Sequence, residues 1–147
     1  MYNKHYRLPL QFSTILSKKA HPLCENIGES IAQNIHLFIL TSFNEHRFNN
    51  NFGCTLWESD FSVVPDVSNW QSNISKSLGD SIEKHERRLR NIKVKVNIDQ
   101  EEFIDPLDQK AKRIKKRIKI EVTGNLKRTD EKFGFSDIIY FSPVSLD

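Results

Sequence analysis

The feature that most constrains this sequence is a change of hydrophobic period near residue 90. Between about Ser68 and Arg88, a stripe of residues lies within about 80° of one line when each residue turns about 100°, as in a helix. Immediately afterwards, from Ile92 to Ile98, apolar and polar residues alternate, which is typical of a strand with one buried face. The chain is therefore predicted to fold as a helix followed almost directly by a strand. The stripe consists of Trp70, Ile74, Leu78, Ile82, His85 and Leu89.

A second amphipathic helix is predicted from Cys24 to about Ser42, because apolar residues recur there every three to four positions. The polar segment after it is rich in Asn and leads to Gly53, which favours a loop. Pro65, with Asp66 and Ser68, supplies start signals for the helix that carries the first stripe. The apolar residues of the earlier helix are Cys24, Ile27, Ile31, Ile35, Phe38 and Ile39.

Two further strands are predicted, at 113–122 and in the run SDIIYFSP, with a turn at Gly124-Asn125. Residues 99–109 are interpreted as an acidic connection, so the strands at 91–98 and 113–122 would pair as an antiparallel hairpin. The predicted class is α+β, with two main helices packed on one face of a small antiparallel β-sheet and an N-terminal arm. The other sheet face would be basic, which is tolerated more easily near an acidic partner. Its cations are Lys93, Lys95, Arg113, Lys115, Arg117 and Lys119.

The chain of 147 residues is predicted to form a single domain over 1–147, with an arm at 1–20, a helical half at 21–90 and a β-sheet half at 91–147. With 37% hydrophobic and 28% charged residues, its composition excludes wholesale disorder and a fibrous structure. No stretch has the pattern of a signal peptide or the roughly 20 apolar residues of a membrane span. We therefore expect a cytoplasmic protein without direct membrane insertion.

Paired carboxylates raise the possibility of glycoside hydrolysis, with Glu58 beside Asp60 and Glu83 three residues before Glu86. That chemistry needs two carboxyl groups at a defined separation across a cleft, and nearness in sequence does not supply it. A solvated or capping role is the simpler interpretation of each pair. No catalytic residue is predicted.

A zinc site could be imagined from His21 and Cys24 together with Cys54, but only the first two have ligand-like spacing. Nothing in the sequence identifies a base that would activate Cys54 as a nucleophile. The two cysteines lack paired spacing and are expected to be reduced, buried hydrophobic residues. We expect no metal and no cofactor.

Basic residues are concentrated in the second half, where 17 of the 22 Lys and Arg lie between Lys76 and Lys132. The segment KAKRIKKRIK, at 110–119, holds seven of them and no acid, so nucleic-acid binding is an alternative function. However, no aromatic residue interleaves with these cations to stack on bases, and acidic residues precede them. A protein surface is the preferred interpretation, with no nucleic-acid partner.

The charges at the end of the first stripe differ in their predicted orientation. Glu86 and Arg88 lie about 80° to either side of the stripe, whereas Arg87 lies about 180° away and faces outward. Glu86 and Arg88 are therefore boundary residues, which can be half-buried and then need partners.

Several segments, in order, resemble the baseplate wedge family that includes the gene-product-25 protein of phage T4 and TssE of type VI secretion. SIAQNIHLFILTSFNEHRF resembles the first core helix of the family and its Gly-Glu-Arg-like turn, with Arg47 at the position of the Arg. NFGCTLW is similar to the Phe/Tyr-Gly-Cys segment. IEKHERRLRNIKVKV resembles the Glu-Pro-Arg motif at a helix end, followed by the first hairpin strand, with Arg87 in place of the proline.

The resemblance implies a structural baseplate component of a contractile injection machine and not an enzyme, although such proteins have carried a lysozyme-like label. It implies docking on wedge proteins like TssF and TssG, and initiation of sheath assembly on subunits like TssB and TssC. It also implies a six-fold, membrane-docked baseplate. The residues predicted to contact other proteins are Glu86, Arg87, Arg88, Arg47, Lys93, Lys95, Arg113, Lys115, Arg117 and Lys119.

Type VI secretion is the preferred system, on the basis of the N-terminal arm and the YFSP ending, while a phage tail and an extracellular injection device remain open. A nucleic-acid-binding module remains the main alternative function. A peptidoglycan hydrolase and a stress-response anti-adaptor are further alternatives.

Overall fold

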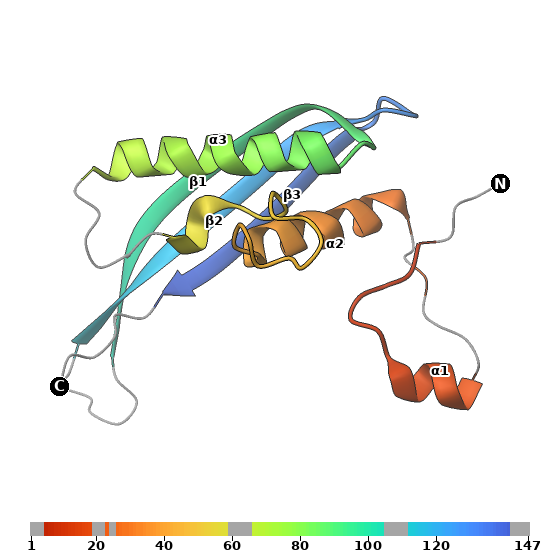
Figure 1. Ribbon diagram of the computed structural model, residues 1–147. Coiled ribbons are helices and arrows are strands. Elements are labelled where there is room, and N and C mark those ends of the chain that lie inside the picture. The colour runs from red at the N-terminus through yellow and green to blue at the C-terminus, as the bar shows by residue number, and fades with distance from the viewer. Residues whose placement is uncertain (1–4, 19–22, 24–25, 59–65, 105–111, 142–147) are drawn as a thin grey trace.

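A computed structural model describes residues 5–18, 23, 26–58, 66–104 and 112–141, with the side chains of 101–104, 112–115 and 141 excepted. In chain order its elements are α1 (Phe12–Lys18), α2 (Ile27–Leu40), the 3-10 helix η1 (Thr55–Glu58), α3 (Val67–His85), β1 (Leu89–Ile104), β2 (Lys112–Leu126) and β3 (Lys132–Phe141). The strands form one antiparallel sheet in the order β1-β2-β3. Helices α2 and α3 lie side by side on one face of it (Figure 1). The predicted α+β architecture is confirmed.

The core lies between the two helices and the sheet. Both predicted stripes face it, and Cys54 and Leu56 close it from the loop side. Leu89 is buried as predicted, but it begins β1 instead of continuing the helix. Cys24 lies outside the described residues. The buried residues of α2 and α3 are Ile31, Ile35, Phe38, Ile39, Trp70, Ile74, Leu78, Ser81 and Ile82.

The start of each main helix is capped by a side chain. The Asn26 carboxamide oxygen accepts from Glu29 N at 2.8 Å, and the Asp66 carboxylate accepts from Asn69 N at 3.0 Å. Each cap satisfies an N–H group that has no partner within the first turn of its helix. Of the three predicted start signals of α3, Asp66 is the one that caps the helix.

The strands are longer than the sequence patterns predict. Residues 99–104, three of which are acidic, belong to β1 and are not part of the connection, because they pair with the basic part of β2: Asp99 lies opposite Arg117, and Glu101 opposite Lys115. Opposite charges across a strand pair favour pairing where alternation of apolar residues no longer does.

The predicted turn at Gly124-Asn125 is wrong, since both residues belong to β2 and the chain turns at 127–130. Gly124 instead lies opposite an irregularity in β1 between Arg90 and Lys93. A Cβ atom at position 124 would lie 3.0 Å from the carbonyl oxygen of Arg90. The glycine therefore permits close approach of two backbones.

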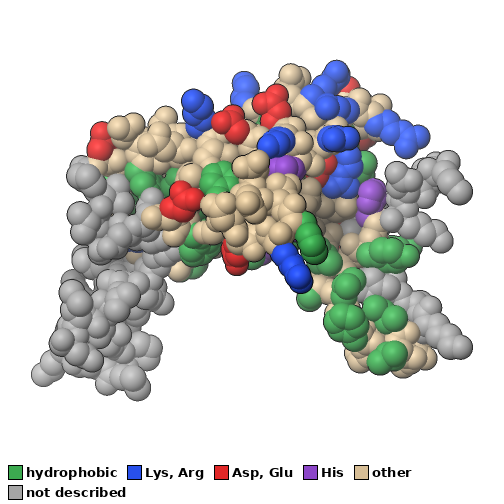
Figure 2. Space-filling model, in the orientation of Figure 1, with side chains coloured by type: hydrophobic (Ala, Val, Ile, Leu, Met, Phe, Trp, Pro, Cys, Tyr) green, Lys and Arg blue, Asp and Glu red, His purple; other side chains and the backbone are tan. Residues whose placement is uncertain are grey.

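The N-terminal arm is anchored to α2, but its own helix is not packed. Arg7 Nε donates to Glu29 Oε1 at 2.7 Å, and the backbone N–H of Leu8 donates to the Gln33 side chain. None of the residues of α1 is buried. The arm projects from the body, and apolar side chains gather on its surface (Figures 1 and 2).

Candidate functional site

The junction between α3 and β1 is built by the last turn of the helix. Glu86 is its C-cap, and the backbone N–H of Glu86 donates to the Ile82 carbonyl at 2.7 Å. With φ −101° and ψ 81°, Glu86 has already left the helical region, so the chain can turn through Arg87 and Arg88 into the strand.

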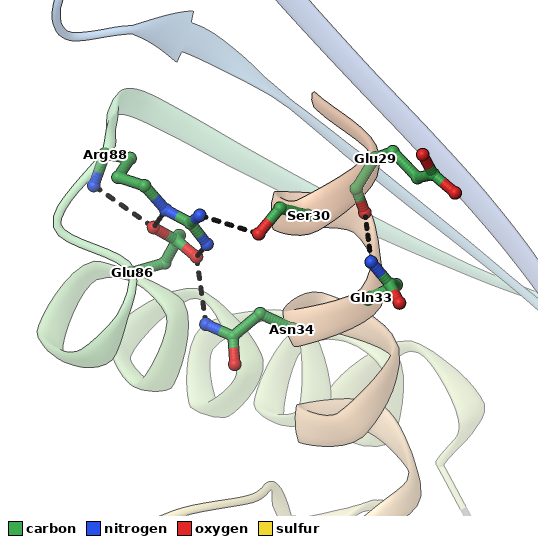
Figure 3. A network of polar contacts seen from close by, with 6 residues as sticks. All are labelled: Glu29, Ser30, Gln33, Asn34, Glu86 and Arg88. Carbon is green, nitrogen blue, oxygen red and sulfur yellow. Dashed lines mark hydrogen bonds and ion pairs between the residues drawn. The ribbon is translucent and has the colours of Figure 1, made fainter. Parts of the chain in front are cut away.

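The Glu86 carboxylate is buried, with 2% of the residue exposed, and it is surrounded by donors (Figure 3). Oε1 accepts from Arg88 Nε at 2.7 Å and from the Arg88 backbone N–H at 3.1 Å. Oε2 accepts from Arg88 Nη2 at 2.6 Å and from Asn34 Nδ2 at 2.9 Å. The ion pair is bidentate, the strongest geometry available to an arginine and a carboxylate.

Arg88 joins this network to α2, because its Nη1 donates to Ser30 Oγ at 2.9 Å (Figure 3). We call Glu86, Arg88, Asn34 and Ser30 the junction network. Asn34 and Ser30 are one helical turn apart on α2, so the network holds the end of α3 against that helix.

Two opposing effects act on the pKa of Glu86. Burial raises it, but hydrogen bonds from the Arg88 side chain, the Asn34 side chain and the Arg88 backbone, together with the charge of Arg88, outweigh burial. The pKa therefore lies below its usual value, and the carboxylate is ionised at neutral pH.

The accessible part of the junction consists of arginines. Arg87 is exposed, as the helical geometry predicts, and 28% of the Arg88 side chain is exposed. Glu86 presents almost no surface, and its carboxylate holds Arg88 in place. A docking role of this region stays a prediction that involves Arg87 and the outer part of Arg88.

Arg47 lies in the loop that joins α2 to η1, and this loop contacts the end of α3. The ring nitrogen Nε2 of His85 lies 3.3 Å from the carbonyl oxygen of Asn51. Arg47 is exposed, and its guanidinium carbon lies 5.5 Å from the centre of the Phe48 ring. The structure therefore brings the loop of Arg47 and the junction of Glu86 to the same end of α3.

The outer face of the sheet carries the predicted cations, but the register neutralises part of their charge. Lys119 Nζ lies 2.8 Å from Glu121 Oε1, and Arg117 Nη2 lies 3.2 Å from Asp99 Oδ2. A hydrogen bond from Lys119 and its charge lower the pKa of Glu121.

Among the remaining predicted cations, Lys93 and Lys95 are exposed, and Lys95 lies opposite Glu121. Arg113 and Lys115 belong to β2, but their side chains lie outside the described part. Alternating charge of this kind suits a protein surface better than a row of phosphates.

The catalytic alternatives receive no support from the described geometry. Glu58 and Glu83 are both exposed, without the apolar surroundings that would make either a general acid, and Asp60 lies outside the described residues. Burial raises the pKa of the Cys54 thiol to about 11, which keeps it protonated and unreactive.

The hypothesis of a zinc site also receives no support from the described residues. His21 and Cys24 lie outside the described residues, and within those residues no three His, Cys, Asp or Glu side chains are grouped as metal ligands. None of the described helices combines the length and apolarity that crossing a membrane would require.

The pattern of the sequence did not reveal Ser30 and Asn34, the partners of Arg88 and Glu86 on α2. Both residues precede a buried isoleucine, Ile31 and Ile35. Two polar residues four positions apart beside an apolar stripe are a signal for a buried polar contact.

The fold and the junction define a small α+β protein with a hydrogen-bonded helix end and a sheet face that no described helix covers, features typical of a protein that assembles with others. The chain belongs to the baseplate wedge protein gp25 family, whose model matches residues 25–131. This family is largely structural, and membership supports a structural role in a phage-tail-like baseplate, in assembly with other baseplate components.

Among solved structures, the fold is similar to that of a Geobacter sulfurreducens protein, a candidate tail lysozyme. That protein is 16% identical to this chain, with a TM-score of 0.54, and the match covers 83% of this chain and 97% of that one. At this identity the similarity supports the fold alone. No curated protein matches the sequence.

Proposed function

We propose that this chain is a wedge-docked baseplate subunit that initiates sheath assembly in a contractile injection machine of the type VI class. Its partners would be wedge proteins like TssF and TssG and sheath subunits like TssB and TssC. The chain would act as one domain in a six-fold baseplate that is cytoplasmic and docked at a membrane. The observation that carries the proposal is the junction network, together with membership of the baseplate wedge protein family.

The junction network supports docking because it holds the helix end while leaving Arg87 and part of the Arg88 side chain exposed. Three of the four hydrogen bonds to the Glu86 carboxylate come from Arg88, one of them from its backbone N–H, and the fourth comes from Asn34. Arg87 is exposed. A preorganised surface loses little conformational entropy when a partner binds. Arg87, Arg88 and Arg47 are the residues we assign to wedge contact.

The sheet supports the sheath-facing role. Within the described residues, β1 and β3 are edge strands, and the face of Lys93, Lys95, Arg117 and Lys119 is not covered by a helix. Free edges can accept or donate a strand, and a charged outer face can select the partner. Arg113 and Lys115 extend the same surface in our proposal.

The docking assignment is tested with Arg87→Glu in the full chain, using purified wedge subunits from the same gene cluster in a pull-down. Arg87 is exposed, so the variant should unfold at the same temperature as the wild type while binding to the wedge is lost. Lys76→Glu is the matched control, since Lys76 is exposed on α3 and lies about 14 Å along the helix axis from its last residue, next to the junction. Equal binding by Arg87→Glu and the wild type would contradict the assignment.

A further inference from the structure

The side chain of Phe48 is the most exposed large apolar side chain among the described residues, at 85%. A single exposed hydrophobic residue is common on protein surfaces and needs no explanation by itself. Phe48 differs because the loop that carries it is tightly built. An exposed ring on a rigid support is a candidate anchor for another protein.

Backbone hydrogen bonds hold the loop at both ends. Asn44 N donates to the Asn50 carbonyl at 2.9 Å, and Cys54 N donates to the Thr41 carbonyl at 3.0 Å. Gly53 allows this closure, since its φ is 122° and a Cβ atom there would lie 2.4 Å from the Thr41 carbonyl oxygen. The loop therefore has one well-defined path.

Aromatic rings connect the tip of the loop to the core. The ring centre of buried Phe38 lies 4.5 Å from that of Phe52, and the ring centre of Phe52 lies 5.1 Å from that of His46. His46 in turn lies 6.4 Å from Phe48, edge to face. Because this row starts in the core, the loop that carries Phe48 is supported before any partner binds.

The charge at the tip is positive. The Arg47 guanidinium lies over the Phe48 ring, and within the described part of the chain no carboxylate pairs with it. Glu45, the acid in the same loop, accepts a hydrogen bond from Ser42 N at 2.8 Å. A partner that receives this tip gains by placing a carboxylate beside Arg47.

We propose that Phe48 and Arg47 form an anchor that inserts into an apolar pocket bordered by Asp or Glu on a neighbouring baseplate protein. This inference rests on the proposed function and adds the contacting residue and the chemistry of the partner site. A protein pocket is favoured over nucleic acid because one arginine engages few phosphates. One ring is likewise too little apolar surface for stable attachment to a lipid bilayer.

Photo-crosslinking from position 48 locates the partner site. The full chain carrying p-benzoylphenylalanine in place of Phe48 is irradiated with the purified wedge subunits, and the crosslinked peptide is identified by mass spectrometry. We expect crosslinks to apolar residues near an Asp or Glu of one wedge subunit. Crosslinking to a second copy of this chain, or to no wedge residue, would overturn the inference.

Affinities for the same subunits give the energetic test. Phe48→Ser should weaken binding by roughly tenfold or more, whereas Phe48→Leu, which keeps an apolar side chain, should stay within about threefold. Arg47→Gln should weaken binding and make the affinity less dependent on salt. Thermal unfolding of each variant should match the wild type, because the altered side chains are exposed.

The two proposals fail in different ways. If the wild type binds no wedge subunit, the proposed function fails. If the wild type binds and Phe48→Ser binds equally well, the anchor is wrong while the proposed function stands.

Discussion

Glu86→Gln is the most informative test of the junction. Glutamine keeps the size and one acceptor oxygen of Glu86, but it puts an NH2 group where an oxygen accepts from Arg88 or Asn34. Breaking a fully buried ion pair costs about 3–5 kcal/mol. Since 28% of the Arg88 side chain is exposed and can be hydrated, we expect a loss of about 2–3 kcal/mol. In a domain of this size that lowers the unfolding temperature by roughly 4–12 °C.

The pH dependence of this loss follows from the lowered pKa of Glu86. A carboxyl group whose folded-state pKa lies below its unfolded value of 4.5 stabilises the fold above that pH. The contribution is lost as the pH falls from 4.5 through the folded-state pKa. The difference in unfolding free energy between wild type and Glu86→Gln should therefore be largest at pH 7 and shrink below pH 4.5.

Urea unfolding followed by circular dichroism measures both effects, with Glu83→Gln as the matched control. Glu83 lies one turn earlier on α3 and is exposed, so its substitution should change stability by less than about 0.5 kcal/mol. A Glu86→Gln variant as stable as the Glu83→Gln variant would refute the argument that the junction network stabilises the helix end. If the difference in unfolding free energy between wild type and Glu86→Gln grew as the pH fell, the predicted direction of the Glu86 pKa shift would be wrong.

Two further predictions concern a glycine within α3 and a buried cysteine. Gly79→Ala should raise the unfolding free energy by about 0.5–1 kcal/mol, because glycine weakens a helix interior and the new Cβ would lie 3.8 Å from Val94 Cγ2, an ordinary contact distance. Urea unfolding measures the gain. A loss of stability would mean that α3 and β1 cannot adjust to the added methyl group. Cys54 should react with Ellman's reagent only as fast as the chain unfolds, because burial raises its pKa to about 11. Peptide mapping that finds Cys54 labelled in the native state would contradict this prediction.

Hydrophobic period was sufficient to predict the two main helices, α2 and α3, and the core sides of β1 and β2. The residues Ile31 and Ile35 of α2 and Ile74 and Leu78 of α3 are buried at the helical spacing from which they were predicted. Such patterns are local, because buried residues recur at a fixed spacing along their own helix or strand. They carry no information about which helix a polar side chain will meet.

The misjudged features depend on contacts between distant segments. Residues 99–104 show no apolar alternation, and only pairing with β2 explains why they continue β1. Gly124 resembled a turn residue, but its function is set by a backbone 34 positions earlier, at Arg90. The bonds of Ser30 and Asn34 to the junction likewise span 58 and 52 positions. In each case the determining partner lies outside any local window.

Arg87 provides a last test of how the helix end is held where the family motif has a proline. Glu86 already lies outside the helical region, which a following proline disfavours, and in the described structure the Arg87 N–H donates to no acceptor. Arg87→Pro should therefore preserve the junction network and raise stability by about 0.4–1 kcal/mol by restricting the unfolded chain. Thermal unfolding measures the gain, with Lys84→Pro, inside the last turn of α3, as the destabilised control. If Arg87→Pro lost as much stability as Lys84→Pro, the end of α3 would depend on the backbone of Arg87. If it gained, the bidentate Glu86–Arg88 pair would be sufficient to hold the end of α3, and the arginine at position 87 would be free for contact with the wedge.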